Sequence, residues 1–106
     1  MSKLREITDA NITAVLNEKD ITIISFKAEW CGPCRILGPI LEDLSSVNND
    51  VMIGKVNVDD NKEISLAYGI KSIPTTIFFK NGEIVNKIIG LKSKEEIQAK
   101  IEELKG

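Results

Sequence analysis

At residues 30–34 the sequence reads Trp30-Cys31-Gly32-Pro33-Cys34, and this segment holds both cysteines of the 106-residue chain. It follows the compact, β-branched run Ile21–Lys27, which is typical of a buried central strand. A long helical pattern comes after it, in which Pro39 should introduce a kink. The apolar residues of that pattern are Ile36, Leu37, Ile40, Leu41, Leu44 and Val47. Both cysteines are therefore expected where a central strand gives way to a long helix.

The N-terminal part of the chain predicts a short strand and then a helix. The strand is expected at Lys3–Ile7. The helix should begin with Thr8 or Asp9 as its N-cap, because either side chain can accept a backbone N–H at a helix start. Its apolar residues have the i, i+3, i+4 spacing of one helix face, and they are Ile12, Val15 and Leu16.

The second half of the chain predicts another strand and two more helices. Val51–Val58 has a strand pattern, and Asn61–Tyr68 is expected to be a short helix that ends at Gly69. Ser93 and Glu96 have the spacing of a capping box. They open a last helix with the apolar residues Ile97, Ile101 and Leu104.

A β-hairpin is predicted before that last helix. Thr75–Lys80 and Glu83–Ile89 flank Asn81-Gly82, and this dipeptide supplies the positive φ angles of a type I′ turn. The element order becomes strand, helix, strand, helix, strand, helix, strand, strand, helix. That order indicates an α/β fold with a central mixed sheet of about five strands, flanked on both faces by about four helices.

Length and composition favour one soluble domain over residues 1–106. The residues are 42% apolar and 28% charged, as in ordinary globular proteins. The net charge of −2 gives no basic footprint for nucleic acid. No apolar run approaches the roughly 20 residues of a membrane helix, so neither nucleic acid nor membrane is an expected partner. The N-terminus lacks the apolar stretch of a secretory signal, which favours the cytoplasm unless a leader has been removed.

Histidine is absent from the sequence. Serine–histidine and cysteine–histidine nucleophile pairs are therefore impossible, and so is any imidazole metal ligand. The chemistry must come from thiols, carboxylates or lysines.

Cys31 and Cys34 have the spacing of a reversible redox pair. Residues at i and i+3 of a helix lie about 5–6 Å apart between Cβ atoms, close enough for a disulfide after a small adjustment. The closed loop is tiny, so the bond constrains the unfolded chain by only about 2 kcal/mol. The helix dipole favours the thiolate of Cys31. Cys31 is expected to attack a substrate disulfide, and Cys34 to resolve the mixed disulfide.

Three other interpretations of the two cysteines stay open at this point. They could form a purely structural bridge, which the short loop disfavours. They could bind zinc, but a zinc site needs four ligands and two sulfurs would have to be shared in a dimer. They could be ordinary buried thiols, although this leaves the intervening Gly-Pro and the preceding tryptophan unexplained.

The segment Trp30–Cys34 resembles the active-site motif of the thioredoxin family, and the resemblance spans essentially the whole chain. The similar stretches are Phe26–Glu29, Pro39, Lys55–Asp59, Tyr68–Thr75, Phe79–Gly82 and Gly90. The resemblance implies the thioredoxin fold, and a general protein disulfide reductase with no bound cofactor other than the redox-active disulfide Cys31–Cys34. It also implies that the protein is a monomer and that it transports electrons in cell redox homeostasis. The expected partners are disulfide-containing proteins and the NADPH-dependent flavoprotein thioredoxin reductase, because the chain has no Gly-x-Gly-x-x-Gly segment of its own.

The resemblance also implies supporting residues around the cysteines. Gly32 and Pro33 lie between them, and Pro33 stiffens the turn and lacks an N–H. Trp30 is expected to form part of a flat apolar surface that binds substrate, although a half-buried core indole is the alternative.

Substrate binding is also implied for three residues further along the chain. Ile73-Pro74 should form a cis peptide that faces the cysteines, with the Ile73 backbone pairing to an extended substrate. The alternative for Pro74 is a plain proline before a strand. Gly90 is expected to leave room for the substrate chain, or else to be a simple strand-end glycine.

One departure from the family pattern concerns Ser25, which stands where a buried aspartate usually accepts the proton of the second cysteine. Serine cannot act as a general base near neutral pH. Either Lys55 stabilises the Cys34 thiolate as a nearby cation, or a water held by Ser25 carries the proton. The attack by Cys31 should be intact and the step that needs Cys34 deprotonated should be altered. Lys27 also departs from the pattern, and a solvated strand-end lysine is the simplest interpretation.

Two other functions compete with the reductase. A binding module or chaperone subunit would use the apolar surface and would survive loss of both thiols. A disulfide oxidant or isomerase is disfavoured by Gly-Pro between the cysteines. A titration against glutathione would separate a reductant from an oxidant.

Overall fold

The computed structural model describes residues 4–106, and its element order is the predicted one. The elements are β1 (Arg5–Glu6), α1 (Ile12–Leu16), β2 (Ile21–Lys27), α2 (Gly32–Val47), β3 (Val51–Asn57), α3 (Lys62–Ala67), β4 (Thr75–Lys80), β5 (Glu83–Ile89) and α4 (Lys94–Lys105). Within the described range the strands form one five-stranded sheet in the order β1-β3-β2-β4-β5. β2 pairs parallel with β3 and antiparallel with β4, so the predicted mixed sheet is confirmed.

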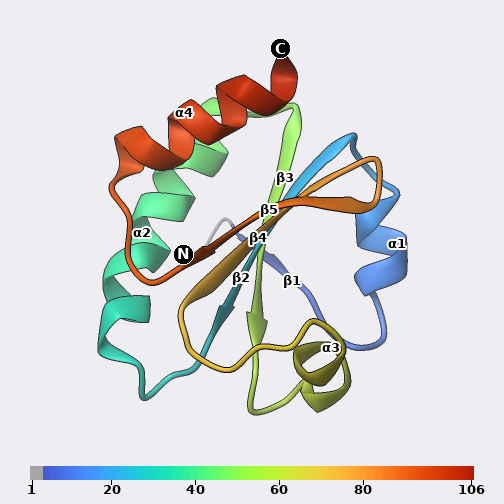
Figure 1. The fold of residues 1–106 in the computed structure, drawn as a ribbon, viewed down its shortest axis with the longest axis vertical. Coiled ribbons are helices and arrows are strands. Elements are labelled where there is room, and N and C mark those ends of the chain that lie inside the picture. Colours follow the sequence, from blue (N-terminus) through green and yellow to red (C-terminus); the bar gives the residue numbers. More distant parts are fainter. Residues whose placement is uncertain (1–3) are drawn as a thin grey trace.

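Helices cover both faces of the sheet. α2 and α4 lie on one face, and α1 and α3 lie on the other (Figure 1). The side chains of β2 alternate between the two cores, because successive residues of a strand point to opposite faces. Ile21 and Ile23 pack with α2 and α4, whereas Ile24 and Phe26 pack with α1 and α3.

The first strand and the first helix are shorter than predicted. β1 ends at Glu6, before the buried Ile7, and the predicted start Lys3 lies outside the described residues. α1 has Asn11 as its N-cap, so the prediction of Thr8 or Asp9 is wrong. The Thr8 N–H donates to Asn11 Oδ1 at 2.8 Å and the Asn11 N–H donates to Thr8 Oγ1 at 3.2 Å, so the two residues hold a turn that delays the helix.

Asp9 instead caps a different helix. Its Oδ1 accepts the backbone N–H of Ile64 in the first turn of α3, at 2.9 Å. The Asp9 N–H in turn donates to Oδ1 of Asn61, the N-cap of α3, at 3.0 Å. The capping chemistry expected of Asp9 is therefore present, but it acts across 55 residues of sequence.

The remaining elements differ little from the predictions. β3 ends at Asn57, one residue before the predicted Val58. The hairpin turn has positive φ angles at Asn81 and Gly82, 54° and 83°, and the capping box of α4 is present. In α2 two members of the apolar pattern are exposed to solvent, namely Ile36 and Val47, while Leu37, Leu41 and Leu44 supply the buried face.

Gly54 is expected to contribute to stability because it lies where β1 packs beside β3. A methyl group on Gly54 would meet the carbonyl oxygen of Arg5 at 2.7 Å and would also contact the Ile7 side chain. Gly54→Ala should therefore lower the free energy of unfolding by about 1–3 kcal/mol. Urea unfolding measures this loss.

The matched control is Gly38→Ala in α2, where the added methyl group meets nothing within 4 Å. This variant should keep its stability or gain up to about 1 kcal/mol, because alanine is the better helix former. A Gly54→Ala variant as stable as the unaltered chain would contradict the predicted clash.

Candidate active site

Cys31 and Cys34 form a disulfide at the start of α2, with their Cα atoms 5.3 Å apart. Cys31 is the N-cap of the helix, and its Sγ accepts the backbone N–H of Cys34 at 3.3 Å. Pro33 occupies the first turn, where an N–H would have no helical partner. The Cys31 sulfur thus receives an N–H and the positive end of the helix dipole, and both stabilise a thiolate.

The two cysteines are equally buried but have different surroundings. Cys31 is 5% exposed and Cys34 is 6% exposed, and both pack against Ala28. Among the described residues, two small cavities of about 170 and 50 Å³ have Cys34 in their walls and not Cys31. Cys34 therefore lines the small cavities beside α2, while Cys31 caps the N-terminus of the helix.

Trp30 lies on the surface beside the disulfide. Its side chain is 69% exposed, so the alternative of a core indole is wrong. The indole N–H donates to Asp59 Oδ2 at 3.0 Å, and the Asp59 N–H donates to Asn57 Oδ1 at 3.0 Å. The sequence does not single out Asp59, because only the fold brings its carboxylate to the indole of Trp30.

Ile73 and Pro74 are joined by the predicted cis peptide bond. The partly buried Ile73 packs against the cluster formed by Ala28 and the two cysteines. The carbonyl of Pro74 accepts the Gly90 N–H at 2.8 Å. The structure therefore brings Ile73 to the disulfide and joins Gly90 to the adjoining bend.

Gly90 has a φ of +94°, and a methyl group placed on it would meet nothing within 4 Å. The left-handed backbone accounts for glycine at this position. The open space beside it is compatible with both interpretations of Gly90, as room for substrate and as a strand-end glycine.

Ser25 and Lys55 are neighbours across the parallel strands β2 and β3. Both residues and Cys34 line the cavity of about 170 Å³. Lys55 is partly buried, and its Nζ lies 4.0 Å from Glu6 Oε1. The predicted neighbourhood of Ser25, Lys55 and the second cysteine is thus present.

Lys27 lies at the end of β2 as predicted, but it is only partly solvated. Its side chain is only 22% exposed, and it lines both cavities beside Cys34. Its Nζ lies 3.0 Å from Oε1 of the exposed Glu29. The hydrogen bond from Lys27, and then its charge, lower the pKa of the Glu29 carboxyl.

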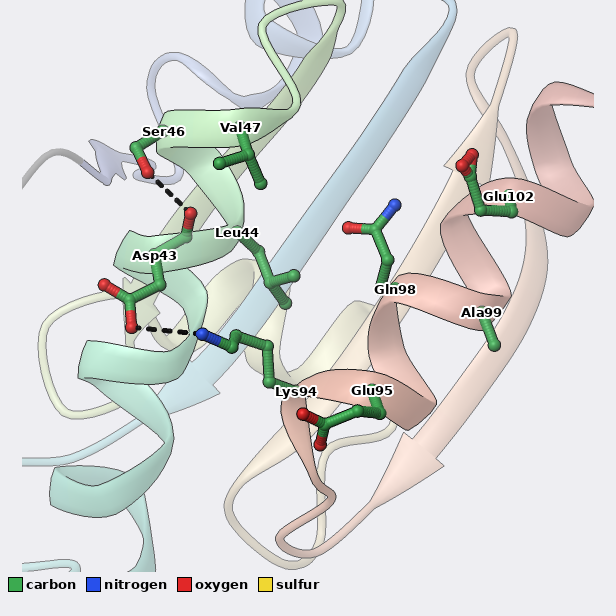
Figure 2. A pocket seen from close by; sticks show the side chains of 9 residues that line it. All are labelled: Asp43, Leu44, Ser46, Val47, Lys94, Glu95, Gln98, Ala99 and Glu102. Atoms are coloured by element: carbon green, nitrogen blue, oxygen red, sulfur yellow. Dashed lines mark hydrogen bonds and ion pairs between the residues drawn. The ribbon is translucent and has the colours of Figure 1, made fainter.

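A larger groove, of about 830 Å³, lies between α2 and α4. In Figure 2 the Lys94 side chain reaches from α4 toward Asp43 on α2, and these two residues form an ion pair of 3.7 Å. No cysteine lines this groove, and its walls are drawn from the C-terminal part of α2 and from α4. Its lining therefore offers no sulfur for the redox chemistry.

Two other kinds of feature are absent from the part of the chain that the structure describes. Residues 4–106 contain no group of three or more cysteine, aspartate or glutamate side chains arranged to hold a metal ion. Over the same residues, no helix combines the length and the apolar character needed to cross a membrane.

The fold and the site define a class of protein, the thiol–disulfide oxidoreductases that carry a dithiol at the N-terminus of a helix. The family model described as Thioredoxin matches residues 3–103. The thioredoxin of Buchnera aphidicola is 41% identical in an alignment of 105 residues, and the match covers 97% of each chain. This chain therefore belongs to the thioredoxin family.

Solved structures agree with this assignment. A mutant thioredoxin from Halobacterium salinarum has a TM-score of 0.91 at 30% identity and covers 97% of this chain and 91% of its own. A second structure comes from work on the thiol resolving mechanism in yeast mitochondrial 1-Cys peroxiredoxin via glutathione/thioredoxin systems. It has a TM-score of 0.87 at 27% identity and covers 96% of both chains. The chain has the thioredoxin fold, and it is a protein disulfide reductase with a redox-active cysteine pair.

Proposed function

We propose that Cys31 is the attacking thiolate and Cys34 the resolving thiol. The observation that carries this assignment is the hydrogen bond from the Cys34 N–H to the Cys31 sulfur at the N-cap of α2. The Cys31 thiolate attacks one sulfur of a substrate disulfide, and the other substrate sulfur leaves as a thiolate. The Cys34 thiolate then attacks Cys31, which forms the Cys31–Cys34 disulfide and releases the second substrate thiolate. The substrate gains two electrons and the dithiol loses two.

We also propose that Trp30, Ile73, Pro74 and Gly90 bind the substrate. The exposed indole of Trp30 and the packing of Ile73 against the cysteine cluster support this surface. An extended substrate would pair with the backbone at Ile73. Gly32 and Pro33 keep the turn between the sulfurs short and compact.

The proposed partners are disulfide-containing proteins and an NADPH-dependent flavoprotein, thioredoxin reductase, which would return the dithiol to its reduced form in an electron-transport role. Peroxiredoxins are one candidate class of substrate, given the solved structure from peroxiredoxin work. We propose that residues 1–106 act as one monomeric domain without a bound cofactor. A cytoplasmic location fits a dithiol that works from its reduced state, because the cytosol keeps thiols reduced.

A redox titration tests the direction of the reaction. The protein is equilibrated with mixtures of reduced and oxidised glutathione, and the dithiol fraction is read by alkylation. We expect a reduction potential more negative than the about −180 mV of protein disulfide isomerase. A value near the about −120 mV of the oxidant DsbA would contradict a reductase.

A double variant separates the reductase from a pure binding module. Cys31→Ser/Cys34→Ser should lose all disulfide reduction coupled to NADPH oxidation through a reductase, because no other thiol is present in the chain. A binding role would survive the same change. Retention of the cellular function by the double variant would therefore contradict the proposal.

A further inference from the structure

The face of the sheet beneath α2 changes from apolar to polar along its length. On β2, Ile21 and Ile23 pack into the core with α2 and α4. Ser25 and Lys27 are the next two residues of β2 that point to this face, because every second residue of a strand points the same way. Their strand leads directly toward the cysteine turn, and the polar end of the face therefore lies under the first turns of α2.

The two cavities beside Cys34 are built on this polar end. Lys27, Cys34 and Arg35 line both of them. Ser25 and Lys55 also line the larger one. Three cations and one carboxylate, Glu42, thus line the larger cavity together with Cys34, and Ser25 adds no negative charge there.

Lys27 combines two features that neither of the other two cations has together: its side chain is largely buried, and it lines both cavities, whereas Lys55 lines only the larger one. The Lys27 side chain is 22% exposed, so its stem is largely buried, and its ammonium group donates to Oε1 of Glu29, which lines the smaller cavity. Its counter-ion, Glu29, is 81% exposed, so water screens much of the carboxylate charge. Arg35 is itself exposed, and its guanidinium donates to the carbonyl of Glu29 at 3.0 Å.

We propose that Lys27 is a positioning residue for the resolving step: its ammonium group stabilises the Cys34 thiolate that attacks Cys31. This inference rests on the proposed function of the dithiol. The Cys34 proton passes to water, for which the cavity of about 170 Å³ has ample room. The Cys34 thiolate then forms the bond to Cys31, and the substrate sulfur leaves with the electron pair of the broken bond.

Six charged side chains from several elements bear on this step. The cations are Lys27, Arg35 and Lys55, and the carboxylates are Glu6, Glu29 and Glu42. The pKa of Glu29 is lowered by Lys27, so this carboxylate loses its charge only below its usual range. Titration of Glu29 therefore contributes nothing to a pH profile measured between neutral and alkaline pH.

The test uses Cys31→Ser protein, in which Cys34 is the single thiol. The probe is iodoacetamide, and its reaction rate with Cys34 is followed over a pH series around the ordinary thiol pKa of about 8.5. Lys27→Met in this background should slow alkylation at neutral pH by about three- to tenfold and move the midpoint of the profile to higher pH. Lys27→Arg should restore the profile, because it keeps the charge.

The matched control is Glu29→Gln, which removes the carboxylate paired with Lys27. It should move the midpoint to lower pH, opposite to Lys27→Met. Equal slowing by Lys27→Met and Lys27→Arg would overturn the inference, because a steric role predicts it and a charge role does not. An unchanged profile in Lys27→Met would overturn it as well.

Stopped-flow kinetics in the intact dithiol separate this inference from the proposed function. Lys27→Met should slow the decay of the mixed disulfide by the same factor and leave its rate of formation unchanged. Formation and decay at the unaltered rates would overturn the role of Lys27 while the proposed function stands. Failure of the unaltered protein to form a mixed disulfide at all would overturn the proposed function.

Discussion

Cys31→Ser and Cys34→Ser are expected to fail at different points of the reaction. Without the Cys31 sulfur no mixed disulfide forms, and substrate turnover should fall by at least about 10³-fold, as expected when a nucleophile is removed. Without the Cys34 sulfur the first attack still occurs, but nothing inside the protein resolves the product. Cys34→Ser should therefore accumulate a covalent complex with its substrate.

The structure gives the reason for this asymmetry. Cys31 accepts an N–H at the N-terminus of α2, whereas Cys34 lies one helical turn further in and lines the internal cavities. Because the two residues have nearly the same exposed fraction, we attribute the difference in behaviour to the electrostatic surroundings of their sulfurs.

Non-reducing electrophoresis with a disulfide-containing substrate protein measures the difference. The covalent band should appear with Cys34→Ser, disappear on reduction with dithiothreitol, and be absent with Cys31→Ser. The double serine variant is the control for non-specific adducts. A covalent band formed by Cys31→Ser and not by Cys34→Ser would reverse the proposed roles.

Much of the fold could be predicted because its signals are local. The Asn81-Gly82 turn and the Ser93–Glu96 capping box each depend on residues a few positions apart. The start of α1 could not be predicted in this way. Asp9 has the chemistry of an N-cap, but it caps α3 through a contact that only the folded chain creates.

The same distinction between local and long-range signals applies to the candidate site. The sulfur pair and its helix follow from five consecutive residues, so they were accessible from the sequence. The indole contact of Trp30 with Asp59 joins residues 29 positions apart, and no local pattern indicates it. The position of Lys27 beside Cys34 also depends on the folded chain, although its strand carries a weaker local signal.

One sequence signal could have pointed to Lys27. The residues of β2 that face α2 are Ile21, Ile23, Ser25 and Lys27. Every second residue of a strand points to the same face. Two apolar residues followed by two polar ones on that face indicate that the strand is buried in the core at one end and lies outside it at the other. This change from apolar to polar residues occurs in the strand that leads to the cysteines. A polar cavity at this place can stabilise a thiolate.

Phe78→Ala is expected to have the largest effect on stability. Phe78 lies in β4 with 0% exposure, and it packs in the same core cluster as Leu37 and Leu41 of α2. Loss of a buried phenylalanine side chain costs about 3–5 kcal/mol, from the lost burial and from the cavity that remains. Domains of this size are stable by only about 5–15 kcal/mol, so a large part of the total should disappear.

Urea unfolding followed by Trp30 fluorescence measures this loss, and Ile84→Ala on the neighbouring strand β5 is the control. Ile84 is 50% exposed, so its truncation should change the free energy of unfolding by about 0.5 kcal/mol or less. Similar losses in the two variants would contradict the assignment of Phe78 to the core. Phe78 shares its core cluster with Leu37, Leu41 and Leu44 of α2, which lie beyond the turn that carries the sulfurs. Folded Phe78→Ala protein should therefore still form the mixed disulfide at the unaltered rate, because stability and sulfur chemistry depend on different segments of the same helix.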